Sequence, residues 1–295
     1  MIRDTTPEKV GIYPQVPAAE YHSWRAFSIS SGLELLKSPG HYMHRLLTPL
    51  EQTEPMRFGT LVHERLLEPG FWERYVVMPD LAAGLCDEKG NPYKNPRATN
   101  KYKALVEDWS RDNPGKVPLD ARDAERVERI YEQAMRKSVV SELLGGVGQS
   151  ELSMLWEEGG WLRCKGRMDR VDTEGKILID IKTTGTSGIE AFVKAIVNRG
   201  QYIQLGHYRA GARALGMEID HAIIIAVETK EPFGVVAITV PEVALKAGEK
   251  HREELFNRLK RAQLDDKWEV YPDTLVTPEF PDWAFSSIER ALGYF

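Results

Sequence analysis

Residues 161–184, WLRCKGRMDRVDTEGKILIDIKTT, constrain the fold more than any other stretch of the sequence. Two runs rich in apolar residues flank residues 173–176, Thr-Glu-Gly-Lys, whose composition is typical of a turn. Strand-like runs joined by a short glycine-containing loop are the pattern of a β-hairpin. The segment therefore predicts two neighbouring antiparallel strands.

Side-chain alternation along a strand assigns the residues of this hairpin to its two faces. The second run presents Ile177, Ile179 and Ile181 on one face, and Leu178, Asp180 and Lys182 on the other. On the first run, Arg167, Asp169 and Val171 share a face. If the two runs pair, Asp169 and Asp180 converge near Lys182. Two carboxylates and a lysine at one strand end suit a hard cation that binds a phosphate and a water.

The spacing of an acid two residues before a lysine is common in this chain and is not specific by itself. Five such pairs occur: Asp87 with Lys89, Glu174 with Lys176, Asp180 with Lys182, Glu228 with Lys230, and Asp265 with Lys267. Most are expected to be solvated surface pairs. Only the Asp180 pair lies on an alternating strand with a second acid on the strand before it.

Length and composition indicate a protein with a sizeable core. The chain has 295 residues, of which 42% are hydrophobic, and it has no apolar run long enough to cross a membrane. The first residues contain no apolar signal core, and two cysteines, Cys86 and Cys164, cannot make a disulfide framework or a four-cysteine zinc site. We therefore expect a cytoplasmic protein. The net charge of −5 gives no sign of nucleic-acid binding, but acids that hold metal contribute to it.

The order of strand-like and helix-like segments predicts one α/β domain, residues 1–295, with a mixed β-sheet flanked by helices. Residues 1–27 read as an irregular lead-in, residues 151–240 as the catalytic sheet core, and residues 266–295 as a proline-containing tail. One helix is expected to begin at residue 28 and to end at Pro39 and Gly40. Further helices are expected over residues 57–69, 119–144, 189–197, 201–215 and 241–264.

Three features outside the hairpin are candidates for binding, and each has a simpler explanation. His63 lies on an expected helix, where a lone histidine usually packs or faces solvent. The loop 89–103 carries Lys94, Arg97 and Lys101 among its five cations, with interleaved tyrosines and no acid, which suits a nucleic-acid strand or a solvated surface. Residues Arg25, Ser30 and Ser31 suit a terminal 5′-phosphate, or the serines simply cap a helix.

Four motifs together resemble a known family. They are Gly-Thr-Leu-Val-His at 59–63 followed by Leu-Leu-Glu-Pro at 66–69, Gly-Arg-Met-Asp at 166–169, Asp-Ile-Lys-Thr-Thr at 180–184, and Gln204 with Tyr208 four residues later. In this order they resemble the nuclease domain of exodeoxyribonuclease VIII, a phage-type recombination exonuclease of the PD-(D/E)XK superfamily. The similarity runs from about residue 12 to the tail. The first acid follows Arg-Met here, whereas a proline often precedes it in that family.

The resemblance implies a role for each matching residue. His63, Asp169 and Asp180 would be metal ligands, and Lys182 the catalytic lysine. Gln204 and Tyr208 match a Gln-x-x-x-Tyr motif of related bacterial nucleases, where they help to hold the active site and DNA. Glu151 occupies a position where the family often has an acid and is a weaker candidate.

The resemblance also implies the reaction and the partners. Such enzymes degrade linear double-stranded DNA from the 5′ end with Mg²⁺, leave 3′ single-stranded overhangs for recombination, form ring-shaped homo-oligomers and often work with a single-strand annealing protein. We expect the same here, in the cytoplasm of a bacterial host and with a phage or prophage origin. Since imidazole is a softer donor than carboxylate, His63 as a ligand would make Mn²⁺ a good substitute.

Two other functions remain compatible with these residues. One is a PD-(D/E)XK endonuclease or helicase-associated nuclease with the same chemistry and no preference for DNA ends. The other is a non-catalytic DNA-binding or assembly protein that has kept the fold. The presence of Asp169, Asp180 and Lys182 argues against the second.

Overall fold

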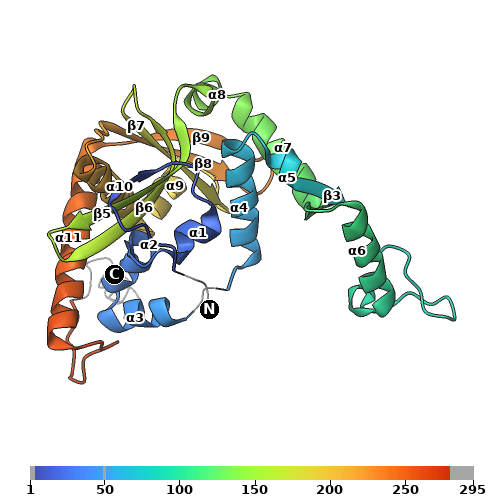
Figure 1. Ribbon diagram of the computed structural model, residues 1–295, viewed down its shortest axis with the longest axis horizontal. Helices are drawn as coiled ribbons and strands as arrows, with labels where there is room; N and C mark the ends of the chain where they lie inside the picture. Colours follow the sequence, from blue (N-terminus) through green and yellow to red (C-terminus); the bar gives the residue numbers. More distant parts are fainter. Residues whose placement is uncertain (1–3, 49–50, 280–295) are drawn as a thin grey trace, which may run out of the picture.

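A mixed β-sheet forms the centre of the computed structural model, which describes residues 4–48 and 51–279 (Figure 1). The order of its strands is β1-β5-β6-β7-β8-β9, and β2 pairs with β6. The strands are β1 (Gly11–Tyr13), β2 (Phe27–Ser28), β5 (Gln149–Glu158), β6 (Leu162–Asp172), β7 (Ile177–Thr184), β8 (His221–Glu228) and β9 (Val235–Val240). Pairs β2–β6 and β7–β8 are parallel, and the others are antiparallel. The predicted α/β class with a mixed sheet is confirmed.

The hairpin predicted from residues 161–184 is present as β6 and β7, joined by a turn at residues 173–176. Strand β7 then pairs in parallel with β8, and a parallel pair needs a crossover connection. Helices α9 (Ile189–Asn198) and α10 (Gln201–Ala214) form this crossover, close to the ranges predicted for them. The two central strands of the sheet therefore come from the part of the chain that carries the Asp-x-Lys motif.

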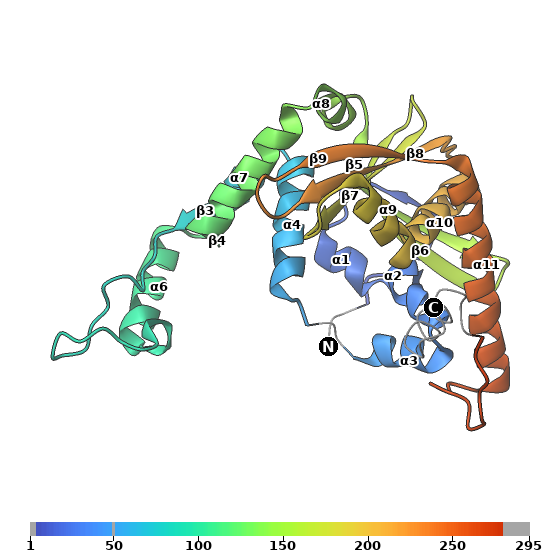
Figure 2. The same ribbon diagram turned by 180° about the vertical axis from the view of Figure 1, so that it is seen from behind.

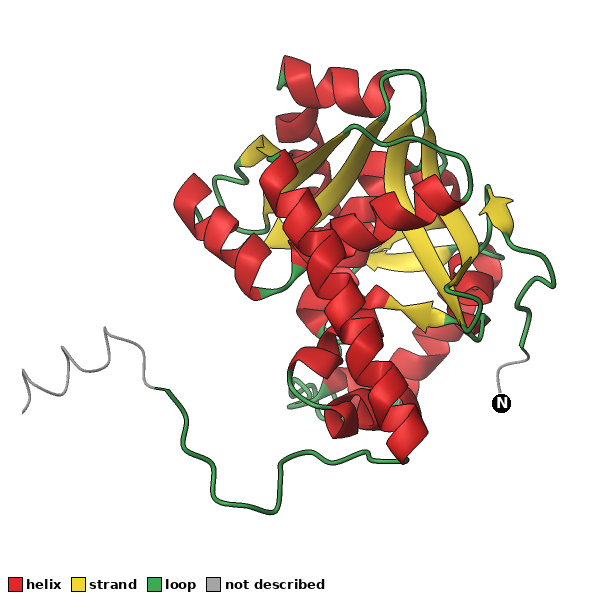
Figure 3. Ribbon diagram, turned by 90° about the vertical axis from the view of Figure 1, so that its left-hand side faces the viewer, coloured by secondary structure: helices red, strands yellow, loops and turns green. Residues whose placement is uncertain are grey.

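Two apolar layers cover the sheet, and β7 contributes to both. Leu178 packs in a core with α10 and the long helix α11 (Glu242–Asp265). Ile179 and Ile181 pack on the opposite face with α4 (Glu54–Leu67) and α7 (Ala121–Met135). Figure 3, viewed from the side of α11, shows this helix crossing in front of the strands. The alternation read from the sequence is thus confirmed for the apolar residues of β7.

Helices α10 and α11 approach each other very closely at two glycines. A Cβ atom at Gly206 would lie 2.5 Å from the Glu249 amide nitrogen, and one at Gly248 would overlap the carbonyl oxygen of Tyr202. Only residues without side chains allow two helix backbones to come this near. The contact fixes α10, which carries Gln204 and Tyr208, against the rest of the fold.

Near the N-terminus, the structure differs from the sequence-based prediction. The expected irregular lead-in contains β1 and a helix, α1 (Ala18–Ser23). The single helix expected after residue 28 is three short ones: α2 (Ile29–Gly32), the 3₁₀ helix η1 (Leu33–Leu36) and α3 (Pro39–Leu47). Pro39 begins α3 instead of ending a helix, because proline is well suited to a first helical position, and the Ser38 side chain caps it.

A long arm, residues 75–120, extends away from the sheet (Figures 1 and 2). It contains the parallel pair β3 (Tyr75–Met78) and β4 (Val117–Asp120), the 3₁₀ helix η2 (Pro96–Ala98) and α6 (Asn100–Asp112). A short helix, α5 (Phe71–Arg74), precedes it. The prediction of a loop over residues 89–103 is therefore wrong in its last part, because Lys101 lies in the first turn of α6.

The helix predicted over residues 119–144 is also divided. Leu119 belongs to β4, and Asp120 caps α7 by accepting a hydrogen bond from the Arg122 amide, 2.9 Å away. Helix α7 ends at Met135, and Arg136 and Lys137 separate it from α8 (Ser138–Gly145). Helix α11 ends at Asp265, close to the predicted end.

The beginning of the tail, residues 266–279, contains no helix or strand. Part of it packs on α3, where the Gly40 amide donates a hydrogen bond of 3.0 Å to the Glu269 carbonyl. The rest of the predicted tail, residues 280–295, lies outside the described residues. None of the helices in the described part of the chain is both long enough and apolar enough to span a bilayer.

Candidate active site

The candidate site lies where β6 and β7 separate. Regular pairing ends at Arg170 and Ile179, and continuing this register places Asp169 opposite Asp180. In place of the next ladder bond, the Ile181 amide donates a hydrogen bond of 2.7 Å to Asp169 Oδ2. The Asp169 carboxylate therefore holds the diverging strand, and the two acids are neighbours, as the alternation predicted.

Asp180 and Lys182 form an ion pair inside this opening. The Asp180 side chain is 1% exposed, and Lys182 Nζ lies 2.6 Å from its Oδ2 atom. Burial raises the pKa of Asp180, because it disfavours the charged form; Lys182 opposes this rise and Asp169 adds to it. Burial lowers the pKa of Lys182, because it disfavours the charged form, but the negative charges of Asp180 and Asp169 outweigh this effect and raise the pKa above its usual value. Lys182 therefore stays protonated at neutral pH.

Helix α4 brings His63 to the same place. A Cβ atom at Gly59 would lie 2.9 Å from Thr183 Oγ1, so glycine lets α4 approach β7 closely. One turn further along, His63 Nδ1 lies 3.5 Å from Asp169 Oδ2. The structure thus joins His63 to the two acids, although more than a hundred residues separate it from them in the sequence.

Glu151 lies on β5, facing Asp169 across the strand pair. Its φ of 56° is unusual for a residue with a side chain, and such conformations are frequent at functional sites. Burial raises the pKa of Glu151 to about 7, and Asp169 and Glu68 contribute to the rise, while Arg167 lowers it through an ion pair. Glu151 therefore titrates near neutral pH.

The Gln204 and Tyr208 side chains lie on α10, and Gln204 Nε2 donates a hydrogen bond of 2.8 Å to Tyr208 Oη. The Tyr208 ring packs on the backbone of β6, where a Cβ atom at Gly166 would lie 3.0 Å from the ring. The glycine of the Gly-Arg-Met-Asp motif thus makes room for the tyrosine. Burial raises the Tyr208 pKa well above its usual value, and Tyr21, Asp180 and Asp169 add to it.

These acids fit a divalent cation by their charge and by their unsatisfied oxygens. Both Asp180 carboxylate oxygens are buried and lack a hydrogen bond of good geometry, although Lys182 is close to one of them. Burial raises the carboxyl pKa values of Asp180 and Glu151, and the neighbouring Asp169 adds to both rises, so a bound cation would stabilise the ionised forms of these acids. Within residues 4–48 and 51–279, no three His, Cys, Asp or Glu side chains are arranged so that they could hold a metal ion as they stand. The site is therefore a set of acids open to a cation and not a preformed cage.

The other predicted binding residues form no hydrogen bond or ion pair with these acids in the described part of the chain. The Arg25 side chain is 79% exposed and pairs with Asp4 at 3.3 Å. Ser30 and Ser31 belong to the short helix α2, which is capped by Ser28 and not by either of them; Ser28 Oγ accepts a hydrogen bond from the Ser31 amide. Ser28 is therefore the cap of this helix, and binding of a 5′-phosphate by Arg25, Ser30 and Ser31 stays a prediction. Lys94, Arg97 and Lys101 lie on the outer part of the arm, beyond β3 and β4.

Sequence reasoning missed three side chains that surround the acids. Arg167 pairs with Glu151, and its guanidinium carbon lies 5.8 Å from the centre of the Tyr21 ring. Glu68 affects the Glu151 pKa and pairs with Arg74 at 3.1 Å. Arg167 and Glu68 were visible inside the Gly-Arg-Met-Asp and Leu-Leu-Glu-Pro motifs. Nothing in the sequence marked Tyr21, because its position depends on how α1 packs.

Comparison with known proteins places this architecture among nuclease-like folds. The model of a family described as a PDDEXK-like domain of unknown function, DUF3799, matches residues 28–274. An exonuclease candidate from Eubacterium rectale is similar in structure, with a TM-score of 0.56 and 14% sequence identity over 93% of this chain and 99% of that chain. A phage-related exonuclease from Haemophilus somnus 129PT aligns with a TM-score of 0.32 and 14% identity, over 63% and 92% of the two chains. No curated protein is detectably similar in sequence.

Proposed function

Because the chain belongs to the PDDEXK-like family DUF3799, we propose that it is a metal-dependent exodeoxyribonuclease that degrades linear double-stranded DNA from the 5′ end and leaves 3′ overhangs for recombination. The superfamily predicted from the sequence motifs is confirmed by this family match. The observation that best supports the proposal is the buried Asp180 carboxylate, which faces Lys182 and lies opposite Asp169 where two strands separate.

The site residues have complementary parts in phosphodiester hydrolysis. Asp169, Asp180 and His63 would hold Mg²⁺, or Mn²⁺ as a substitute, which supplies Lewis-acid activation of phosphate and water when bound. Lys182 keeps its proton and offsets the negative charge that develops on the phosphate. Tyr208 remains a neutral phenol, and because Gln204 donates to its oxygen, the Tyr208 hydroxyl proton is free to bind an acceptor.

Glu151 is the group of this site best suited to proton transfer. With a pKa of about 7, its carboxyl group both gives and takes a proton readily near neutral pH. Arg167 holds it in place through the ion pair. We propose that Glu151 supports the reaction in this way, as a weaker candidate than Asp169, Asp180 and Lys182.

The preference for DNA ends is tested directly with linear and closed circular duplexes in Mg²⁺. An exonuclease releases nucleotides from the linear duplex and spares the circle, whereas an endonuclease cuts both. End-labelled duplexes with 5′-phosphate and 5′-hydroxyl ends then show whether a terminal phosphate is needed. No metal-dependent nucleotide release from either substrate would instead favour a DNA-binding protein without catalysis.

Assembly and partners are further parts of the proposal and rest on the family resemblance. We propose a ring-shaped homo-oligomer that works in the cytoplasm of a bacterial host beside a single-strand annealing protein. A phage or prophage origin fits the same function. Light scattering of the purified protein measures the mass of the particle and therefore the number of subunits in the homo-oligomer.

The role of His63 is tested by replacing it with alanine. A ligand histidine must be neutral with a ring nitrogen free, and His63 Nδ1 already faces Asp169. We expect His63→Ala to weaken Mn²⁺ binding by roughly 10-fold or more, and excess Mn²⁺ to restore part of the activity. Calorimetric titration of Mn²⁺ into both proteins measures this loss. The exposed His44 on α3, changed to alanine, is the control. Equal Mn²⁺ affinities for wild type and His63→Ala would leave a two-carboxylate site.

The arm is expected to contribute to DNA binding through its basic residues. Lys94, Arg97 and Lys101 are exposed, so replacing all three with glutamine removes charge without removing packing. If each contacts a phosphate, the slope of log K against log salt concentration falls by up to about 3, since each contact contributes about 0.9. The matched control changes Lys246, Lys250 and Arg261, exposed on α11. An unchanged slope in the arm variant would mean that the arm is only a solvated surface.

A further inference from the structure

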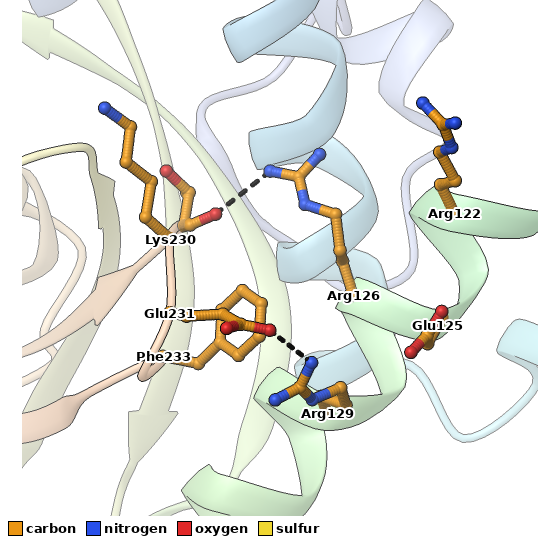
Figure 4. Close-up of a pocket in the computed structure, with 8 residues that line it drawn as sticks. Arg122, Glu125, Arg126, Arg129, Lys230, Glu231 and Phe233 are labelled. Atoms are coloured by element: carbon orange, nitrogen blue, oxygen red, sulfur yellow. Dashed lines mark hydrogen bonds and ion pairs between the residues drawn. The ribbon is translucent and has the colours of Figure 1, made fainter.

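A cavity of about 400 Å³ lies between α7 and the connection from β8 to β9, outside the catalytic acids (Figure 4). Four of its eight lining residues are cations. The lining residues are Arg122, Glu125, Arg126 and Arg129 from α7, and Thr229, Lys230, Glu231 and Phe233 from the β8–β9 connection. Six of the eight are charged, and they come from two elements that are distant in the sequence.

Three of these cations present their charged groups on the same side of the cavity. Figure 4 shows the ends of Lys230, Arg126 and Arg122 in a row. Arg126 is anchored, because its Nη2 atom donates a hydrogen bond of 3.0 Å to the Thr229 carbonyl and its guanidinium lies 3.8 Å from the centre of the Phe58 ring. The exposed side chains of Arg122 and Lys230 form no ion pair or hydrogen bond with the residues that the structure describes.

The acids of the cavity do not cancel this charge. Glu231 is bound by Arg129, with 2.5 Å between Oε1 and Nη1, and Asp123, which is not part of the lining, divides its charge between Arg126 and Arg57. Glu125 is the one remaining carboxylate of the lining. The surface is therefore locally positive on a chain whose formal net charge is −5.

The row of cations lies beside the catalytic strand. The Thr229 amide donates a hydrogen bond of 2.9 Å to the carbonyl of Thr184, the last residue of β7. Thr184 is two residues beyond Lys182, a distance of about 7 Å along a strand, which is the axial rise of about two nucleotides of one DNA strand. A DNA strand that continues from Lys182 in the direction of β7 would bring a neighbouring phosphate toward this row.

We propose that Arg122, Arg126 and Lys230 bind the sugar-phosphate backbone of the DNA duplex whose end enters the catalytic site; this inference rests on the proposed nuclease function. Free nucleotides would share the phosphate chemistry but also offer a base to stack. The cavity offers no open ring for it, because Phe233 is 3% exposed and Arg129 lies over its ring at 4.9 Å. Backbone contacts without base contacts fit an enzyme that digests DNA of any sequence.

Replacing Arg122 and Lys230 together with glutamine tests the proposal. Duplex binding is measured in EDTA, where no cleavage occurs, over a series of salt concentrations. We expect the slope of log K against log salt to fall by about 2, since two phosphate contacts are lost. We also expect neutral methylphosphonates near the duplex end to weaken binding by the wild type and to have little effect at those positions on the double variant.

The control changes Lys250 and Arg261 to glutamine, because they are an exposed lysine and arginine on α11, on the opposite side of the molecule from α7 (Figures 1 and 2). This control should keep the wild-type slope. The proposal is overturned if the wild type does not bind duplex at low salt, or if the Arg122 and Lys230 variant keeps the wild-type slope and methylphosphonate pattern. Competition by inorganic phosphate or a mononucleotide as strong as that by duplex would also overturn it in favour of a small-molecule site.

The same experiments separate this inference from the proposed nuclease function. Binding in EDTA does not require catalysis, so a protein that binds duplex as expected but releases no nucleotides with Mg²⁺ contradicts only the nuclease. If the protein is an active exonuclease but the Arg122 and Lys230 variant has the same salt slope as the Lys250 and Arg261 control, only the proposed backbone-binding surface is contradicted. Both replaced side chains are exposed and have no partner among residues 4–48 and 51–279, and thermal melting at the wild-type temperature verifies that the variant is folded.

Discussion

Replacing Asp180 with asparagine is expected to lower the rate of nucleotide release by on the order of 10³-fold or more. Asparagine keeps the size of the side chain but removes the negative charge that a divalent cation needs. The substitution should not unfold the protein. Burial raises the pKa of Asp180 and so opposes its negative charge, which offsets part of the cost of leaving Lys182 with only Asp169 as a counterion.

Activity and stability are therefore expected to move independently in Asp180→Asn. Initial rates on end-labelled linear duplex and thermal melting are measured on the same preparation. Asp172→Asn on the same hairpin is the control, because Asp172 lies at the turn and accepts hydrogen bonds from the Glu174 and Gly175 amides, a role that asparagine keeps. Wild-type-like turnover by Asp180→Asn would falsify its assignment to the catalytic site.

Replacing Gly248 with alanine is expected to destabilise the fold by about 3 kcal/mol or more, at the upper end of the range for overpacked interiors. The added methyl group would overlap the carbonyl oxygen of Tyr202 on α10. Backbone atoms cannot turn aside as a flexible side chain can, so the two helices must separate. The separation uncovers the apolar residues of α10 and α11 that pack in the core.

The measurement for Gly248→Ala is chemical denaturation, followed by circular dichroism. Gly145→Ala is the matched control, since Gly145 ends helix α8 and a Cβ atom there would meet nothing within 4 Å. That variant should be as stable as the wild type. A Gly248→Ala protein within about 0.5 kcal/mol of the wild type would contradict the close crossing of α10 and α11.

The centre of the fold and of the candidate site followed from local sequence rules. Alternation of period two and a four-residue turn determine which residues of β6 and β7 face each other, and both are visible in a sequence. These rules therefore predict that Asp169 and Asp180 are neighbours, just beyond the last regular pair of the two strands. The contact between Gln204 and Tyr208 follows in the same way, because residues four apart on a helix are neighbours on one face.

Elements that depend on distant parts of the chain were missed or misjudged. The charged amphipathic pattern continues through Arg136 and Lys137, so nothing local reveals the break between α7 and α8. Pro39 is compatible with both the end of one helix and the start of another. The ion pair of Glu151 with Arg167 exists only because β5 and β6 pair in their observed register, and the roles of all these side chains remain predictions.

The hydrogen bond from the Ile181 amide to the Asp169 carboxylate ties the candidate site to the opening motions of the sheet. In an ordinary sheet, a strand amide is protected by a backbone carbonyl, and its exchange with solvent reports only on the backbone. Here the protecting group is a carboxylate of the candidate site. Any fluctuation that lets solvent reach this amide also releases Asp169, so the site keeps its shape only as long as this part of the sheet stays closed.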